Sequence, residues 1–264
     1  MKRPGRLKRL FDLLFKLDYL RTLYINCKLF PFRIAIRIPV FIYRGGVDIR
    51  HNKRGSIKFS TSIRPGIIRV GAPLDYSVHG TRLWRGGRFS IQGSMTVGGT
   101  MLLATGSSFV VDSLGNADIG SDFFFNVGSI FYCFNKINIG NSCSVSWQTQ
   151  IIDTNLHFMV DKEGIVNRCF GDIEIGNYCW IGNRVTVSQG TKLPNYSIVA
   201  SNSLINRNYS NEQEKIIYAG MPANPIKSGY RRIYSEDYQE LLFNYFSTHP
   251  DETVVLLEKV IQER

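Results

Sequence analysis

Apolar residues recur every six positions through the centre of the chain. The stretch "IGNYCWIGNRVTVSQGTKLPNYSIVASNSLI" at 175–205 shows this period without a slip. A helix repeats after 3.6 residues and a strand after two, so neither explains it. A period of six is typical of a parallel β-helix, in which each side of a triangular prism takes one short strand and one turn. The aliphatic residues predicted to point inward are Ile175, Ile181, Val187, Leu193, Val199 and Ile205, with inward companions at Cys179, Val185, Thr191, Ser197 and Ser203.

The same period extends towards the N-terminus. It continues through Val127, Cys133, Ile139, Val145 and Ile151, with companions at Ile119, Phe125, Phe131, Ile137, Cys143 and Thr149, and reaches back to Ile91, Val97, Leu103 and Phe109. Between Ile151 and Ile175 the stretch "DTNLHFMVDKEGIVNRCFGD" breaks the pattern, which predicts a loop that leaves the prism at 153–172. Gly140, Gly176 and Gly182 each follow an inward Ile, and we expect them to provide positive φ at the corners.

These patterns predict an all-β solenoid with helical extensions at both ends. We divide the chain into a basic amphipathic helix at 1–30, a strand-rich lead-in at 31–59, the β-helix at 60–208 and a C-terminal segment at 209–264. In the lead-in, alternating Ile34, Ile36 and Ile38 favour a strand. The tail is typical of one or two amphipathic helices, split near Pro250. No apolar stretch is long and uncharged enough to suggest a transmembrane helix.

The formal net charge is +11, and much of it is concentrated at the N-terminus. Leucines with near-helical spacing alternate with basic residues there: Leu7, Leu10, Leu14, Leu17 and Leu20, with Lys8, Arg9, Lys16 and Arg21 between them. Such a helix either lies on an anionic membrane surface or packs on the domain with solvated charges, and the sequence leaves both open. No recognition motif accompanies the charge, so we do not expect a nucleic-acid partner.

The five cysteines do not form the pattern of a disulfide framework. Their number is odd and no CxxC pair is present, which argues against both disulfides and a structural zinc site. Cys133, Cys143 and Cys179 fall on predicted inward positions, where burial keeps thiols unreactive. We therefore expect no metal and a reducing compartment, the cytoplasm, with attachment to the inner face of the membrane if the N-terminal helix binds lipid.

Three motifs resemble the hexapeptide-repeat acyltransferases, whose fold is a left-handed parallel β-helix. They are "IEIGNYCWIGNRVTVSQGTKLP", "YSIVASNSLINR" and the closing "YAGMPANPIK", and the similarity covers roughly residues 120–230. The segment "VSWQTQIIDTNLH" further resembles the branch that O-acetylates bacterial surface polysaccharides. Asn155 and Leu156 stand where that branch usually has Asp and Phe, and Ser201 and Asn202 replace a usual Ala-Gly pair.

The resemblance implies an acetyl-CoA-dependent O-acetyltransferase acting on a sugar hydroxyl of a surface glycan or its precursor. Its catalytic base would be His157, the histidine at the start of the extruded loop; imidazole suits this role near neutral pH. Asp153, four residues earlier, would orient the imidazole or bind the acceptor; an equally good interpretation is a solvated carboxylate that caps the loop. No covalent acyl-enzyme is expected.

The resemblance also assigns binding residues and an assembly. The cofactor groove would include Trp180, Gly182, Asn183, Ser201, Asn206, Arg207, Lys227 and Arg231. The cations Lys227, Arg231 and Arg232 would meet the phosphates of coenzyme A, or else form a solvated basic surface. The acceptor residues would be Asn126, Trp147 and Asn155, although Trp147 also suits ordinary packing. Family members assemble as trimers, so a homotrimer is expected.

Other functions remain open at this point. A zinc-dependent β-helix enzyme would need three converging histidines, and of the four in the chain His51, His79 and His249 lie outside the regular pattern. A non-catalytic β-helix scaffold is the stronger alternative. Among enzymes, an amine or an antibiotic acceptor would give N-acyl or xenobiotic acetyl transfer instead.

Overall fold

The computed structural model describes residues 15–74 and 86–262 of the 264-residue chain. Two parts are described separately: the main body at 16–231, and the C-terminal segment that follows it. Leu7, Leu10 and Leu14 of the predicted N-terminal helix lie outside the described residues, as does His79.

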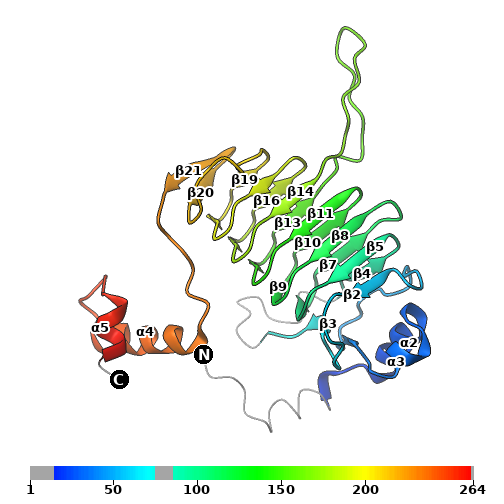
Figure 1. The fold of residues 1–264 in the computed structure, drawn as a ribbon, viewed down its shortest axis with the longest axis horizontal. Helices are drawn as coiled ribbons and strands as arrows, with labels where there is room; N and C mark the ends of the chain where they lie inside the picture. Colours follow the sequence, from blue (N-terminus) through cyan, green and yellow to red (C-terminus); the bar gives the residue numbers. More distant parts are fainter. Residues whose placement is uncertain (1–14, 75–85, 263–264) are drawn as a thin grey trace. The chain divides into compact units, whose positions relative to one another are not determined.

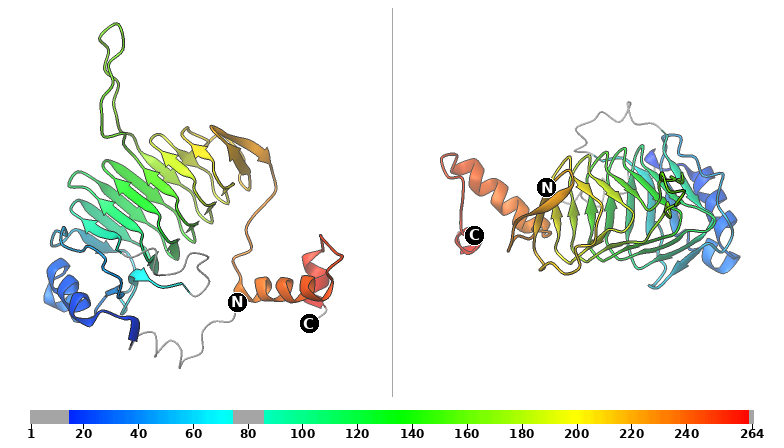
Figure 2. Two further views of the ribbon diagram at one scale, coloured as in Figure 1. Left: turned by 180° about the vertical axis from the view of Figure 1, so that it is seen from behind. Right: turned by 90° about the horizontal axis from the view of Figure 1, so that it is seen from above.

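The main body is a parallel β-helix with three faces (Figures 1 and 2). The first face is a nine-stranded sheet, in the spatial order β1 (Val40–Ile42), β3 (Ile68–Ala72), β6 (Met101–Ala104), β9 (Phe123–Phe125), β12 (Ser144–Val145), β15 (Trp180–Ile181), β18 (Ile198–Val199), β20 (Ile217–Gly220) and β21 (Ala223–Lys227). All of its pairings are parallel except that between β20 and β21, which is antiparallel.

The other two faces are parallel sheets of six strands each. The second face contains, from its C-terminal end, β19 (Leu204–Ile205), β16 (Thr186–Ser188), β13 (Gln150–Ile152), β10 (Ile130–Cys133), β7 (Ser108–Val111) and β4 (Arg88–Ile91). The third face contains β17 (Lys192–Leu193), β14 (Ile173–Ile175), β11 (Lys136–Ile139), β8 (Asn116–Ile119), β5 (Ser94–Val97) and β2 (Ile57–Phe59).

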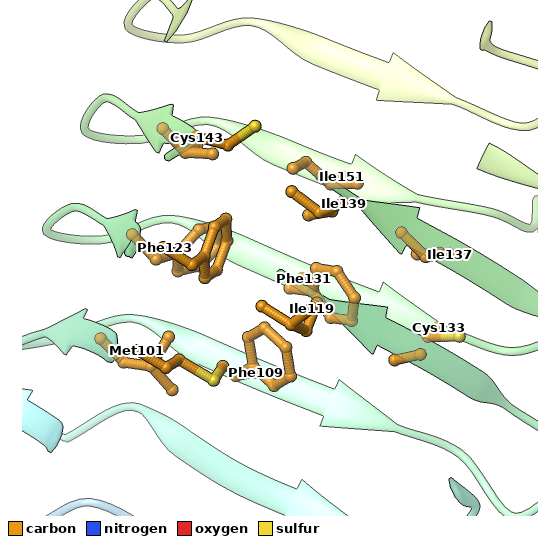
Figure 3. Close-up of a cluster of buried hydrophobic side chains, with 14 of the residues drawn as sticks. Met101, Phe109, Ile119, Phe123, Phe131, Cys133, Ile137, Ile139, Cys143 and Ile151 are labelled. Atoms are coloured by element: carbon orange, nitrogen blue, oxygen red, sulfur yellow. The ribbon is translucent and has the colours of Figure 1, made fainter. Parts of the chain in front are cut away.

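The core lies between the three faces and consists of the residues that the six-residue period placed inward. Every predicted inward position from Ile91 to Ile205 is buried. Residues of successive turns stack on one another: the ring centre of Phe109 lies 4.0 Å from that of Phe131 in a parallel stack (Figure 3). The ring of Phe125 meets that of Phe109 edge-on. Each turn therefore buries its inward residues against those of the next, which no single turn achieves alone.

The turns are not of equal length. Val187 pairs with Ile205, eighteen residues later, as expected for three sides of six residues each. Phe89 pairs with Phe109 twenty residues later, and Phe109 with Phe131 twenty-two residues later. The early strands are longer, and alternate residues of one strand, such as Ile137 and Ile139, both point inward. The uniform period predicted for this half is therefore wrong, although the predicted residues are buried; Val127, for example, lies in a turn beyond β9.

Close packing of backbones, and not positive φ, explains the corner glycines. A Cβ on Gly140 would lie 2.7 Å from the backbone nitrogen of Asn177, and one on Gly176 would lie 2.7 Å from that of Asn195. The left-handed residues of these corners come two positions later, at Ser142 and Tyr178. The prediction that glycine supplies positive φ there is thus wrong: glycine is needed because a side chain would strike the next turn.

The N-terminal end of the prism is covered by two helices, α2 (Tyr19–Leu29) and α3 (Phe32–Ala35). Ile34 lies in α3 and Ile36 at its C-cap, so the strand predicted from their alternation is wrong. Ile36 is exposed and Ala35 is the buried residue of α3, so the alternation does not mark a buried side of a strand. The sheets begin with β1 and β2, before residue 60. Leu17, which was predicted to lie in the N-terminal helix, instead forms an isolated antiparallel bridge with Tyr43.

The C-terminal segment contains α4 (Glu236–Thr248) and α5 (Leu257–Gln262), with Pro250 between them. The Ser235 side chain accepts a hydrogen bond from the backbone N–H of Tyr238 and caps α4. Tyr245 connects the two helices, because its hydroxyl donates to Glu252 and accepts from Lys259. No described helix has the length and apolar character needed to cross a membrane.

Candidate active site

Residues 153–172 form a long hairpin that leaves the coil between β13 and β14 and projects from the prism (Figures 1 and 2). Antiparallel bridges between Thr154 and Phe170, and between Val160 and Val166, join its two arms. Its root is fixed by aromatic contacts: the ring of Phe170 packs edge-on against Phe134, 5.3 Å away, and the guanidinium of Arg168 lies over Phe170 at 4.0 Å. The two strands of the hairpin are thus bridged to each other, and aromatic contacts hold its root against the prism.

His157 lies on the first arm of this hairpin, three residues beyond the Thr154 bridge, and is exposed. The chain before it is shaped by hydrogen bonds: Asn155 N–H donates to the carbonyl of Cys169, and Leu156 N–H donates to the hydroxyl of Thr154. Leu156 has a φ of 61°, a conformation that a branched apolar residue rarely adopts. Asn155 is exposed beside it. The predicted base is therefore presented to solvent by a specific local turn.

Asp153 is fully buried at the root of the hairpin. Its two carboxylate oxygens accept hydrogen bonds of 2.7 Å from the backbone N–H groups of Phe134 and Asn135, in the turn after β10. Burial raises the pKa of Asp153, against the lowering effect of these N–H donors. Among the described residues no hydrogen bond connects its carboxylate to His157. The geometry agrees with a capping carboxylate, in a buried and not a solvated position.

Five of the predicted binding residues lie along one edge of the prism, between the first and second faces, which we call the first edge. Its corners, at 126–129, 146–149, 182–185 and 200–203, stack through hydrogen bonds from one turn to the next. The members on this edge are Asn126, Trp147, Gly182, Asn183 and Ser201. A Cβ on Gly182 would lie 2.6 Å from the carbonyl oxygen of Val199, so this corner accepts no side chain.

Trp180 borders the first edge from the outer surface of β15. Its side chain is 38% exposed, and its indole N–H donates to the hydroxyl of Ser146, 3.1 Å away. This bond fixes the ring against the corner of the preceding turn. Ser146 was not predicted as a site residue; its position next to Trp147, opposite a strand that carries an outward Trp, is the signal that identifies it.

The remaining cofactor candidates lie elsewhere. Asn206 and Arg207 belong to the edge between the second and third faces, the second edge, which also carries the hairpin. The Arg207 guanidinium binds the Ala223 carbonyl at 2.8 Å and the Asn224 side chain, so it holds β21 in place. Lys227 ends β21 with its ammonium 5.7 Å from the ring centre of Tyr230, and Arg231 follows in the exposed chain.

One chain does not bring these groups into a single site. His157 belongs to the second edge, whereas Asn183 and Ser201 belong to the first, and the width of the second face separates the two edges. A strand of three residues, such as β13, spans about 10 Å. A site that uses both edges of one chain would have to span this width.

A shallow polar groove of about 550 Å³ runs along the third face and was not predicted. Outward residues of neighbouring strands line it in register, with Asp118 beside Asn138 and Asn138 beside Glu174. The side-chain oxygen of Asn138 is buried and lacks a hydrogen-bond partner. The alternation of inward Ile with outward Asp, Asn or Glu on these strands is the sequence signal that could have identified this groove.

Three of the five cysteines lie inside the prism, and His249 lies in the C-terminal segment, which is described separately. Cys133, Cys143 and Cys179 are buried in the core, and burial raises the pKa of the Cys133 thiol. The hydrogen bond with Cys143, together with burial, raises the pKa of Cys179. His249 stacks on Tyr245 in the C-terminal segment. Within residues 15–74 and 86–262 no three His, Cys, Asp or Glu side chains form a group able to hold a metal ion.

Solved structures provide the comparison with known proteins, since no protein-family model and no curated protein sequence matches the chain. The polySia specific acetyltransferase NeuO aligns with a TM-score of 0.50 and 16% identity, over 81% of this chain and 88% of that chain. This shows a shared fold.

Two further alignments fall below a TM-score of 0.5. AntD, an N-acyltransferase from Bacillus cereus in complex with dTDP and 3-hydroxybutyryl-CoA, gives 0.41 at 14% identity, over 89% of this chain and 98% of that chain. The polysialic acid O-acetyltransferase OatWY gives 0.39 at 22% identity, over 61% and 78%.

Proposed function

We propose that this protein is an acyl-CoA-dependent acyltransferase that moves an acetyl group from acetyl-CoA to a sugar hydroxyl of a surface glycan or its precursor. The observation that carries the proposal is His157, an exposed imidazole on an ordered hairpin, placed where the sequence resembles the O-acetylating branch of the hexapeptide-repeat acyltransferases. The fold shared with an acetyltransferase supports it. A left-handed sense of the coil is part of the proposal.

His157 acts as a general base. It takes the proton of the acceptor hydroxyl as the oxygen attacks the thioester carbonyl, so that the new C–O bond forms without a free alkoxide. The carbonyl oxygen gains negative charge and is stabilised by backbone N–H groups that line the site. When the tetrahedral intermediate collapses, the C–S bond breaks and the proton passes from the imidazolium to the departing thiolate. The buried thiols of the core take no part.

Coenzyme A lies along the first edge. Asn183 and Ser201 are partly or fully exposed in successive corners there, Gly182 keeps the backbone free of side chains, and Trp180 borders the edge with a ring held by Ser146. Lys227 and Arg231 supply positive charge towards the C-terminal end of the coil, whereas Asn206, on the second edge, would reach this coenzyme only from a neighbouring copy. Arg207 contributes indirectly, because its guanidinium is bonded to β21.

The active site forms between copies of the chain in a homotrimer. The separation of the two edges supports this, since the hairpin of one copy reaches the first edge of the next. Six apolar side chains of the hairpin are exposed and offer a contact surface: Leu156, Phe158, Met159, Val160, Ile165 and Val166. Asn155 from the hairpin, with Asn126 and Trp147 from the first edge, then surrounds the acceptor sugar. The place of action is the cytoplasm, where acetyl-CoA is available.

Release of free thiol from acetyl-CoA in the presence of a panel of glycans tests the proposal. Wild type should release thiol with one or more glycans, and His157→Ala should lose about 10²–10⁴-fold in kcat, the usual contribution of a general base. His249→Ala, which changes a histidine of the C-terminal segment, is the matched control and should retain activity. Equal rates for wild type and His157→Ala would show that the β-helix is a scaffold or uses another base.

The same assay separates the nature of the acceptor. Amino sugars placed beside their hydroxyl analogues distinguish N-acyl from O-acetyl transfer, and mass spectrometry of the product shows which atom is modified. Thiol release with amino sugars alone would reassign the protein to N-acyl transfer while leaving the role of His157 intact.

A further inference from the structure

The helix α2 carries apolar residues on the side that packs on the protein, where Ile25 and Leu29 are buried, and also on its outer side. The side that faces the protein includes two polar residues: the amide of Asn26 pairs with the backbone of Val40, accepting from its N–H and donating to its carbonyl, and the hydroxyl of Thr22 accepts from the N–H of Ile42. These side chains satisfy the free edge of β1, the first strand of the nine-stranded sheet, as a neighbouring strand otherwise would.

The outer side of α2 is also largely apolar. With about 100° between successive residues, the exposed side chains fall within one arc of about 140°, opposite the buried ones. They are Tyr19, Leu20, Leu23, Tyr24 and Cys27. Leu20 is 82% exposed, far more than a leucine of a packed helix. The adjoining α3 adds Phe32, which is 78% exposed, and Ile36 follows one turn later.

Positive charge predominates around these apolar side chains, and the two flanking carboxylates are already engaged: Asp18 caps α2 and Asp48 pairs with Arg50. From Tyr19 to Val47 the sequence contains no Asp or Glu but five cations: Arg21, Lys28, Arg33, Arg37 and Arg44. Arg33 and Arg37 are exposed and alternate with Phe32 and Ile36. Exposed leucine and phenylalanine, tyrosines whose hydroxyls suit the boundary with water, and flanking cations together match the surface of an anionic bilayer.

We propose that the outer side of α2, together with α3, binds the surface of an anionic phospholipid membrane. The apolar side chains enter the boundary between headgroups and acyl chains, while the exposed Arg33 and Arg37 bind lipid phosphates. A water-soluble acidic protein would also attract the cations, but it would not explain why the most exposed positions are Leu20 and Phe32. This membrane binding does not depend on acyl transfer.

Sedimentation of the full-length protein with vesicles tests the proposal. Wild type should bind vesicles of phosphatidylcholine containing phosphatidylglycerol and bind pure phosphatidylcholine weakly. The double variant Leu20→Glu with Leu23→Glu should lower the partition coefficient by about tenfold or more, because it removes two leucines from the interface and adds negative charge. Leu114→Glu with Val254→Glu, which adds the same charge at exposed apolar positions elsewhere, should bind as wild type.

A second variant tests the electrostatic part. Arg33→Gln with Arg37→Gln should weaken binding to phosphatidylglycerol vesicles while leaving weak binding to phosphatidylcholine unchanged. Melting temperature and sedimentation coefficient in the absence of lipid are recorded for every variant, and both should equal the wild-type values. Transfer to a soluble acceptor should be equal in all variants.

Three results would overturn the proposal. The first is a wild-type protein that does not sediment with anionic vesicles. The second is binding by the Leu20→Glu, Leu23→Glu variant that equals wild type. If removal of residues 2–14 then abolishes binding, those residues and not α2 bind the membrane. The third is a changed sedimentation coefficient of that variant without lipid, which would identify the surface as a contact between copies of the chain. If that variant does not fold, unchanged binding by Arg33→Gln with Arg37→Gln refutes the proposal.

Discussion

Replacement of Asp153 by alanine separates a structural from a catalytic role for this carboxylate. The substitution removes both acceptors of the Phe134 and Asn135 N–H groups, in a place that water does not reach. Each buried donor left without a partner costs about 1–3 kcal/mol, so two would cost about 2–6 kcal/mol. Since the buried charge itself was unfavourable, we expect the lower part of this range, about 2–4 kcal/mol.

Asp161 provides a matched control. Its carboxylate also accepts two backbone N–H groups, from Glu163 and Ile165, but it lies on the exposed part of the hairpin, where water replaces the lost acceptor. Urea unfolding followed by circular dichroism should show a large loss of stability for Asp153→Ala and little change for Asp161→Ala. Equal stabilities of the two variants, with activity lost only in Asp153→Ala, would contradict the structural role and support a catalytic one.

Three further predictions follow from particular contacts. Burial raises the pKa of Asp153, so this carboxyl group binds a proton more tightly in the folded chain than in the unfolded chain. Wild type should therefore gain stability relative to Asp153→Asn as the pH falls from about 7 to about 4. Unfolding curves of both proteins at each pH measure this. Gly176→Ala should cost about 1–3 kcal/mol because its Cβ would strike the next turn, whereas Gly171→Ala, whose Cβ would meet only ordinary contacts, should melt near wild type. Trp180→Phe removes the hydrogen bond to Ser146 and, under the proposed function, should raise KM for acetyl-CoA more than it lowers kcat; an unchanged KM would exclude Trp180 from the cofactor site.

The hydrophobic period predicted the interior of this fold well, because an inward position in a solenoid is defined by local sequence alone. A strand of two or three residues cannot hide Ile181 or Val199 unless they point into the prism, and both are buried. The same argument fails for turn length. The period fits residues such as Val127 by coincidence, since the extra residues of a twenty-two-residue turn shift the register without changing which apolar side chains are buried.

The candidate site was less predictable, because it depends on which edge each corner joins. Ser201 and Arg207 are close in the sequence and lie on either side of β19, yet they belong to different edges. The role of Thr22 and Asn26 could not be predicted from the sequence either. Polar residues on a helix usually face solvent, whereas these two hydrogen-bond to the free edge of β1. Such contacts follow from tertiary structure and from nothing local.

The unequal turn lengths have a consequence for how this coil can change during evolution or design. A turn of eighteen residues encloses a smaller cross-section than one of twenty-two, and the stacked rings of Phe109 and Phe131 fill the wider part. Turns are therefore not exchangeable modules. A duplicated copy of the narrow turn around Ile181 would extend the narrow end without strain, but inserted beside Phe109 it would leave no room for the ring. Additional turns therefore fit only at the C-terminal end, where successive turns have the same length.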